Sequence, residues 1–168
     1  MAERLAEESG LAVIYVATAE AKDSEMAERI ARHRGRRPAG WKTVDAPLRL
    51  AQSLRAHAAP GHCVIVDCLT LWLSNLIHRG ERGGDRFDLE LYSAEKRALL
   101  EFLSALPGEI VLVSNEVGMG VVPVGKLSRL FVDEAGRLNQ EIAARCERVT
   151  LMAAGLPLTL KTPRPEPG

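Results

Sequence analysis

A polar pair and a glycine-rich run follow an apolar segment in the second half of the chain. Residues 110–113 are Ile-Val-Leu-Val, the composition of a buried parallel strand. Asn115 and Glu116 come just after it, and two glycines and a proline complete the loop. Ligands of open α/β sheets collect at the carboxyl ends of strands. The pattern predicts chemistry on a charged small molecule at Asn115 and Glu116, with an ordinary polar loop as the alternative.

Two more apolar runs end in polar residues. Residues 12–17 lead into Thr18, Ala19 and Glu20, and residues 62–67 end in Asp67. In phosphate-binding α/β proteins, an acid at a strand end holds a magnesium ion or the waters around it. The alternative is that Asp67 caps the helix expected to follow it.

Residues 29–38 surround one histidine, His33, with five arginines. Guanidinium groups match phosphate oxygens bidentately, so the run predicts a phosphate-binding segment. Nearby positive charge favours a neutral, nucleophilic imidazole, and histidine can carry a phosphoryl or nucleotidyl group covalently. The alternative is a solvated basic helix end, where cations are favoured by the helix dipole.

Composition limits the classes of function. The chain has 168 residues, 46% of them hydrophobic, with 22 acidic and 22 basic side chains. The balanced charge argues against a charged surface for binding nucleic acid or membranes. No apolar run approaches the roughly 20 residues of a membrane span. Cys63, Cys68 and Cys146 lack metal-ligand spacing and are typical of a reduced cytoplasm. We therefore expect a cytoplasmic protein with one domain over residues 1–161 and a flexible tail over 162–168.

Alternating segments would position these residues. Strands are expected at 12–17, 42–45, 62–67, 109–114, 149–153 and 158–161. Helices are expected at 2–9, 25–34, 47–57, 69–79, 88–106 and 125–147, with a flexible loop at 80–87. Ser24 is expected to cap the second helix, Gly35 to end it, and Pro47 to lie in the first turn of the third. This alternation predicts an α/β fold with a mostly parallel sheet and helices on both faces.

Four motifs together resemble a known family. They are Tyr-Val-Ala-Thr-Ala-Glu at 15–20, Arg-Ile-x-x-His-Arg-x-x-Arg-Pro-x-x-Trp at 29–41, Val-Ser-Asn-Glu-Val-Gly-Met-Gly-Val-Val-Pro at 113–123 and Asp-x-x-Gly-Arg-x-Asn-Gln at 133–140. Their order and spacing resemble the bifunctional adenosylcobinamide kinases/adenosylcobinamide-phosphate guanylyltransferases of cobalamin biosynthesis. The likeness extends from residue 1 to about residue 161.

The resemblance implies a P-loop nucleotide-binding α/β fold, usually assembled as a homotrimer. It implies phosphorylation of the aminopropanol hydroxyl of adenosylcobinamide, a corrinoid, with ATP or GTP. It further implies transfer of GMP from GTP, through a guanylylated histidine, to give adenosylcobinamide-GDP and pyrophosphate. ATP, GTP and Mg²⁺ are the expected small-molecule partners.

The resemblance also implies roles for individual residues. His33 becomes the guanylylated nucleophile. Asp67 matches an acidic nucleotide-binding position at the end of its strand, and the strand-end pattern adds the prediction that it holds Mg²⁺ through water. The same pattern predicts that Asn115 and Glu116 lie in an active-site loop. Asp45 stands where the family usually has glutamate. The positions that match nucleotide-binding residues are Thr18, Ala19, Glu20, Arg34, Gly35, Arg36, Arg37, Asp45 and Asp67.

One family feature has no match. The family begins with a strand and a Gly-x-x-x-x-Gly-Lys-Ser loop that cradles phosphates, and residues 1–9 resemble the helix after that loop. We therefore expect the first strand and the Walker A loop to be missing from residues 1–168. The alternatives to catalysis are a truncated or inactive homologue that binds nucleotide or corrinoid, and a scaffold domain without a ligand.

Overall fold

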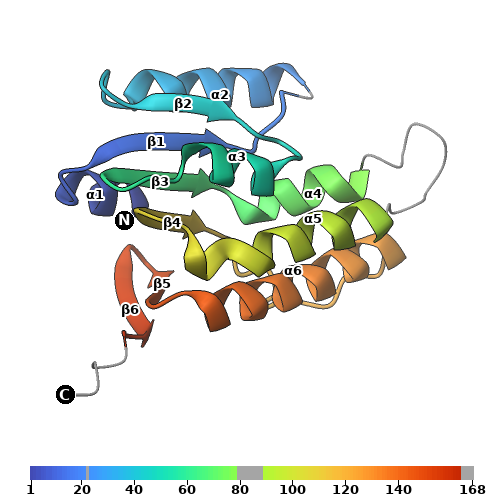
Figure 1. Ribbon diagram of the computed structural model, residues 1–168. Coiled ribbons are helices and arrows are strands. Elements are labelled where there is room, and N and C mark those ends of the chain that lie inside the picture. The colour runs from blue at the N-terminus through green and yellow to red at the C-terminus, as the bar shows by residue number, and fades with distance from the viewer. Residues whose placement is uncertain (22, 79–88, 164–168) are drawn as a thin grey trace.

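The computed structural model describes residues 1–21, 23–78 and 89–163 (Figure 1). The strands are β1 (Ala12–Ala17), β2 (Lys42–Asp45), β3 (His62–Asp67), β4 (Glu109–Val113), β5 (Val149–Ala153) and β6 (Leu156–Lys161). The helices are α1 (Ala2–Glu8), α2 (Ser24–Arg36), α3 (Leu50–His57), α4 (Leu69–His78), α5 (Leu89–Phe102) and α6 (Lys126–Arg145), with a 3₁₀ turn at Leu103–Ala105. The expected loop at 80–87 and the tail from residue 164 onward lie outside the described residues.

The central sheet confirms the α/β prediction. Its four strands are parallel and lie in the order β2-β1-β3-β4. Ala17 at the end of β1 is in register with Asp45 on one side and with Asp67 on the other, and Asp67 is in register with Val113. The carboxyl ends of all four strands are therefore level. The residues that follow them share one edge of the sheet.

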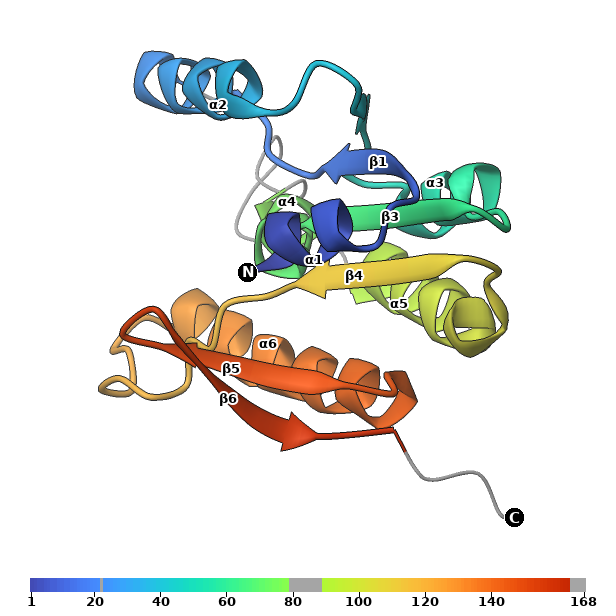
Figure 2. The same ribbon diagram turned by 90° about the vertical axis from the view of Figure 1, so that its left-hand side faces the viewer.

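Helices cover both faces of the sheet, but unequally. On one face, Ala6 of α1 packs with Val13, Tyr15, Cys63 and Ile65. On the other face, side chains of β1 and β3 pack against α3, α4, α5 and α6 in the main core, where Trp72 is fully buried. Figure 2 shows α1 in front of β3, with α3 and α5 behind the sheet. The larger core fixes the sheet, and thereby its carboxyl edge.

The last two strands form a separate two-stranded antiparallel sheet, β5-β6. They connect through Ala154 and Gly155, which have φ angles of 51° and 78°. Positive φ at both positions is what a tight two-residue hairpin requires. The expectation of a strand starting at residue 158 was therefore wrong by two residues, because the turn is so short. Figure 2 shows the hairpin lying along α6.

Three helix boundaries also differ from expectation. Asp23, not Ser24, caps α2, because its carboxylate accepts a hydrogen bond from the Met26 amide at 2.7 Å, and α2 continues through Gly35 to Arg36. Helix α3 begins at Leu50 rather than near Pro47. The Trp72 indole and the Asn75 amide donate to the carbonyls of Leu48 (2.8 Å) and Pro47 (3.2 Å). These bonds from α4 hold the segment outside the helix.

In the part of the chain that the structure describes, none of the helices has the length and apolar character needed to cross a membrane.

Candidate functional site

The ends of β1 and β3 are joined by buried hydrogen bonds. The Thr18 hydroxyl donates to the Cys68 carbonyl at 2.8 Å and accepts from the Cys68 amide at 2.7 Å. The Thr18 amide donates to the Asp67 carbonyl at 3.1 Å, and the Asn75 side chain donates to the Thr18 carbonyl at 2.7 Å. Thr18 is fully buried. Its hydroxyl therefore supports the site by fixing two strand ends relative to α4.

Asp67 is held from the neighbouring strand. Its Oδ2 accepts a hydrogen bond from the hydroxyl of Tyr15 on β1. The Tyr15 ring lies beneath the Arg37 guanidinium, 3.5 Å from the ring centroid, and 6.4 Å from the Trp41 ring. Burial, followed by the hydrogen bond to Asp67, raises the pKa of Tyr15. The phenol therefore remains a donor, and it orients the Asp67 carboxylate at the sheet edge.

The segment after β4 is bonded to two helices. The backbone amide of Asn115 donates a hydrogen bond to the Thr70 hydroxyl of α4 at 2.7 Å. Asn139 of α6 donates to the Asn115 carbonyl at 3.3 Å and accepts from the Ser114 hydroxyl at 2.7 Å. Glu116 is exposed and accepts from the Gly118 amide at 3.1 Å. Asn115 and Glu116 thus lie at the same sheet edge as Asp67, as the sequence predicts.

Ala19 and Glu20 line a shallow depression between the β1–α2 connection and α4. Its volume is about 150 Å³, and it is lined by Ala19, Glu20, Asp23, Met26, Leu71, Ser74 and Asn75. Ligand pockets typically measure roughly 300–1,000 Å³. The depression therefore accommodates only part of a nucleotide-sized ligand.

Helix α2 carries His33 and contributes no buried residue. His33 itself is exposed. Arg34 binds both carboxylate oxygens of Asp45 on β2, at 2.5 and 2.8 Å. Arg37, which follows the helix, donates to the Thr43 hydroxyl at 3.2 Å and covers Tyr15. Two of the five arginines thus point to the sheet. The structure brings Arg34 to Asp45 and Arg37 to Tyr15, whose hydroxyl in turn bonds Asp67.

Residues to which the sequence assigns no individual role make up much of this framework. They are Tyr15, Thr70, Asn75 and Asn139, each bonded to a residue next to a strand end. Each of them contributes a single polar group within an apolar strand or an amphipathic helix, and such a group is a weak signal in the sequence. These residues become neighbours of the strand ends only through the order of the strands in the sheet, which local sequence does not predict.

Two other histidines make hydrogen bonds to backbone carbonyls, and two of the cysteines are buried. The His57 ring bonds the Ser53 carbonyl at 2.9 Å, and the His62 ring bonds the His57 carbonyl at 3.0 Å. Cys63 and Cys68 are buried free thiols, and burial raises the pKa of each. Among the described residues, no group of three or more His, Cys, Asp or Glu side chains gathers as a metal site. A magnesium ion held by one carboxylate and substrate phosphates is compatible with Asp67.

The chain is similar to proteins of known description over nearly its whole length. Residues 1–160 match the family model of cobinamide kinase / cobinamide phosphate guanyltransferase. The chain is 59% identical over 161 residues to the bifunctional adenosylcobalamin biosynthesis protein CobP of Pseudomonas aeruginosa, covering 96% of this chain and 89% of that protein. It is 37% identical over 155 residues to the bifunctional adenosylcobalamin biosynthesis protein CobU of Escherichia coli, covering 89% of this chain and 86% of that protein. The Salmonella typhimurium protein of the same name is also 37% identical, over 158 residues.

Proposed function

Because the chain belongs to the cobinamide kinase / cobinamide phosphate guanyltransferase family, we propose that it phosphorylates adenosylcobinamide and then transfers GMP from GTP to adenosylcobinamide phosphate. The observation that carries the proposal is the placement of an exposed histidine in an arginine-rich helix that follows a strand of the nucleotide-binding sheet. The acids Asp45 and Asp67 end β2 and β3, the two strands that flank β1 in that sheet. A nucleophile and groups for phosphate recognition thus come from adjoining segments.

His33 is the proposed nucleophile of the transfer step. An imidazole nitrogen of His33 attacks the α-phosphorus of GTP, the bond from that phosphorus to the oxygen that bridges to the β-phosphorus breaks, and pyrophosphate leaves. An oxygen of adenosylcobinamide phosphate then attacks the same phosphorus and releases the imidazole, giving adenosylcobinamide-GDP. Arg34, Arg36 and Arg37 would stabilise the negative charge on the phosphates.

The proposed nucleotide contacts include residues that pair with one another in the structure. Arg34 and Asp45 form an ion pair in which their side chains remain 47% and 60% exposed. An exposed pair costs little to open, so both groups are available to a nucleotide. Ala19, Glu20 and Gly35 would line the same ligand. Asp67 would hold Mg²⁺ with the phosphates, and the ion would neutralise their charge.

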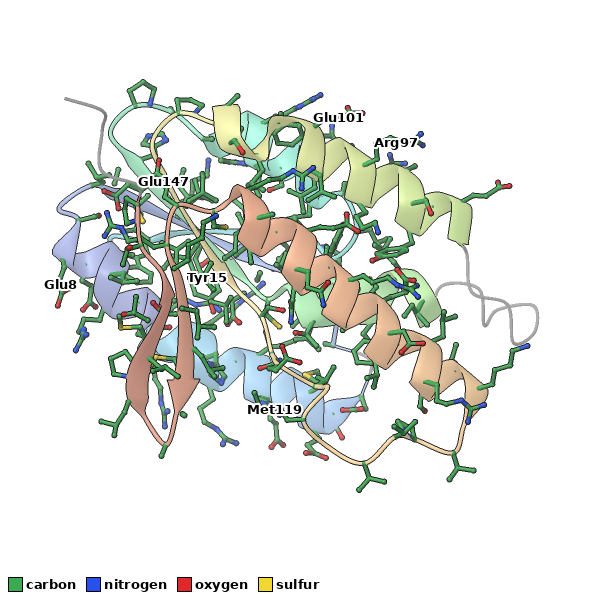
Figure 3. All side chains as sticks on the ribbon, turned by 90° about the horizontal axis from the view of Figure 1, so that it is seen from below. Glu8, Tyr15, Arg97, Glu101, Met119 and Glu147 are labelled. Atoms are coloured by element: carbon green, nitrogen blue, oxygen red, sulfur yellow. The ribbon has the colours of Figure 1, made fainter. Side chains whose placement is uncertain are left out.

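The loop from β4 to α6 is the proposed corrinoid side of the site. Met119, Val121, Val122 and Val124 are 75%, 95%, 73% and 94% exposed. Arg129 donates to the carbonyls of Pro123 (3.2 Å) and Val124, which anchors the end of the loop. Figure 3 labels Met119 in this loop. An anchored loop with exposed apolar side chains suits a large, partly apolar substrate.

We further propose a homotrimer in the cytoplasm.

The proposal is tested by incubating the full-length protein with GTP that is labelled both in its α-phosphate and in its guanosine. We expect a covalent guanylyl label that is lost in acid and survives alkali, as a histidine phosphoramidate does. Adenosylcobinamide phosphate should then remove the label as adenosylcobinamide-GDP. Reversible retention of GTP without a covalent label would indicate a binding protein, and no retention would indicate a scaffold.

The kinase step needs its own assay. Adenosylcobinamide is incubated with ATP or with GTP labelled in the γ-phosphate, and formation of labelled adenosylcobinamide phosphate is followed. Transfer of label from at least one donor is expected. Absence of transfer from both would remove the kinase half of the proposal and leave the guanylyl transfer standing.

A further inference from the structure

Tyr15 contacts three residues at the carboxyl edge of the sheet. It is the fourth residue of β1, and only 2% of it is exposed. Its hydroxyl donates to Asp67 on β3, and its ring lies against Arg37 after α2 and against Trp41 before β2. A single buried side chain therefore connects an acid of the sheet with the end of the helix that carries His33.

We propose that Tyr15 is a positioning residue of the nucleotide site, which fixes the Asp67 carboxylate through its hydroxyl and the C-terminal end of α2 through its ring. This inference rests on the proposed function, in which Asp67 and Arg37 bind nucleotide. Tyr15 itself does not touch the reacting atoms in this proposal.

The hydroxyl has a specific task. A buried hydroxyl costs free energy unless it is hydrogen-bonded, so a phenylalanine would fill the same space in the core more simply. In this position the hydroxyl bonds Oδ2 of Asp67. Because a carboxylate is planar, fixing Oδ2 also fixes the direction of Oδ1. The orientation of Asp67 towards a ligand is thereby set before the ligand arrives.

The ring has a second task. Since α2 contributes no buried residue, its link to the sheet depends on side chains near its C-terminal end. The Arg37 guanidinium lies 3.5 Å from the centre of the Tyr15 ring and also bonds Thr43. A cation–π contact is stronger where it is shielded from water, as it is over this buried ring. His33 precedes Arg37 by one helical turn, so the ring helps to set where His33 lies.

Two substitutions separate the tasks. Tyr15→Phe keeps the ring and removes the hydroxyl, and we expect it to weaken equilibrium binding of GTP about ten-fold with little effect on α2. Tyr15→Leu removes the ring as well, and we expect amides in residues 30–37 to exchange hydrogen at least several-fold faster without nucleotide. Amides of α4 should serve as the internal reference for that measurement.

Tyr92→Phe is the matched control, because Tyr92 is 1% exposed and lies in the main core, in α5. It should leave GTP affinity unchanged. A double-mutant cycle with Asp67→Asn adds a second test. In the Asp67→Asn background, Tyr15→Phe should change GTP affinity by less than two-fold, because the bond it removes serves Asp67.

The outcomes are distinguishable. Wild-type protein that binds no GTP would overturn the proposed function. Wild-type protein that binds GTP, together with Tyr15→Phe protein of equal affinity, would overturn the positioning role of the hydroxyl alone. Full additivity with Asp67→Asn would also overturn it. Unchanged exchange of residues 30–37 in Tyr15→Leu would overturn the role of the ring, and this measurement remains decisive if Tyr15→Phe folds poorly.

Discussion

The sheet edge and helix α2 are built in opposite ways. At the edge, Thr18, Asp67 and Asn115 are joined to neighbouring elements by hydrogen bonds, several of them buried. Helix α2 contributes no buried residue, and an exposed ion pair links it to β2. The groups proposed to bind nucleotide therefore sit partly on a fixed frame, whereas the proposed nucleophile sits on a weakly held helix.

The contrast suits a protein that must carry a group from one substrate to another. A nucleophile that receives GMP from GTP and delivers it to a corrinoid phosphate meets two different ligands at one atom. A helix held by exposed contacts can adjust its position at low cost, since such contacts contribute little stability. The acids that orient the phosphates gain more from a rigid setting.

The largest expected effect is on covalent guanylylation at His33 in α2. His33→Ala should lower covalent guanylylation by at least about 1,000-fold, because it removes the imidazole that is proposed to hold the label. The free energy of unfolding should change by less than about 0.5 kcal/mol, because His33 is exposed. Acid-labile label per mole of protein and urea unfolding are the two measurements.

His57→Ala is the matched control for that experiment, since His57 bonds a backbone carbonyl of its own helix. It should label at the wild-type rate. Label retained by His33→Ala at the wild-type rate would move the nucleophile to another imidazole.

The next effect is on stability, at the sheet edge. Thr18→Val removes a buried hydroxyl that serves both the amide and the carbonyl of Cys68. An unsatisfied buried amide costs about 1–3 kcal/mol, so we expect the free energy of unfolding to fall by roughly 2–3 kcal/mol. Urea denaturation with an unchanged slope is the measurement.

Thr43→Val provides the control, because Thr43 is an exposed strand residue bonded to Arg37. Its cost should stay below about 0.5 kcal/mol, as for most surface substitutions. Equal losses in the two variants would contradict the idea that the edge owes its rigidity to shielded hydrogen bonds.

The sequence predicts the main frame well and its internal bonding poorly. Apolar β-branched runs predict β1, β3 and β4, because such runs fit only a buried strand when flanked by turn residues. The placement of Asp67 and Asn115 at one edge then follows from parallel strands. Tyr15 was not foreseen as a partner of Asp67, because the two are 52 residues apart and meet only through the pairing of β1 with β3.

The helix ends show the same division between local and non-local causes. Ser24 and Asp23 are both good caps, and local sequence does not choose between them. Gly35 is compatible with a helix stop, but here it lies within α2. The start of α3 depends on bonds from Trp72 and Asn75 in α4. No local sequence pattern in residues 46–50 predicts those bonds.

A smaller effect on stability, coupled to an effect on activity, is expected at the ion pair between α2 and β2. Arg34→Ala should lower the free energy of unfolding by less than about 1 kcal/mol, because both partners are substantially exposed. The rate of guanylylation should nevertheless fall about ten-fold or more, because Arg34 is proposed to contact phosphate. Single-turnover labelling and thermal unfolding are compared.

Arg29→Ala, exposed on the same helix, is the control for charge alone. It should leave the labelling rate within about two-fold of wild type at physiological ionic strength. If Arg29→Ala and Arg34→Ala slow labelling equally, the contribution of α2 is general electrostatics rather than a contact by Arg34.

The smallest expected effect tests whether α2 unfolds separately from the core. Gly35→Ala and Gly136→Ala are equivalent substitutions inside helices, since a Cβ at either position meets no atom within 4 Å. Each should favour its helix by up to about 1 kcal/mol. Helix α6 buries Ala135, Leu138 and Ile142 in the main core, so Gly136→Ala should raise the free energy of global unfolding by most of that amount.

Gly35→Ala should act differently, because α2 buries nothing and can open locally. We expect amide exchange within α2 to slow about three- to five-fold, with global unfolding by urea nearly unchanged. Both quantities are measured on the same preparations by hydrogen-exchange mass spectrometry and fluorescence. Were Gly35→Ala to raise global stability as much as Gly136→Ala does, α2 would fold cooperatively with the core. The contrast between a fixed sheet edge and an adjustable nucleophile helix would then lose its energetic basis, and the position of His33 would be set by the core in the same way as that of Asp67.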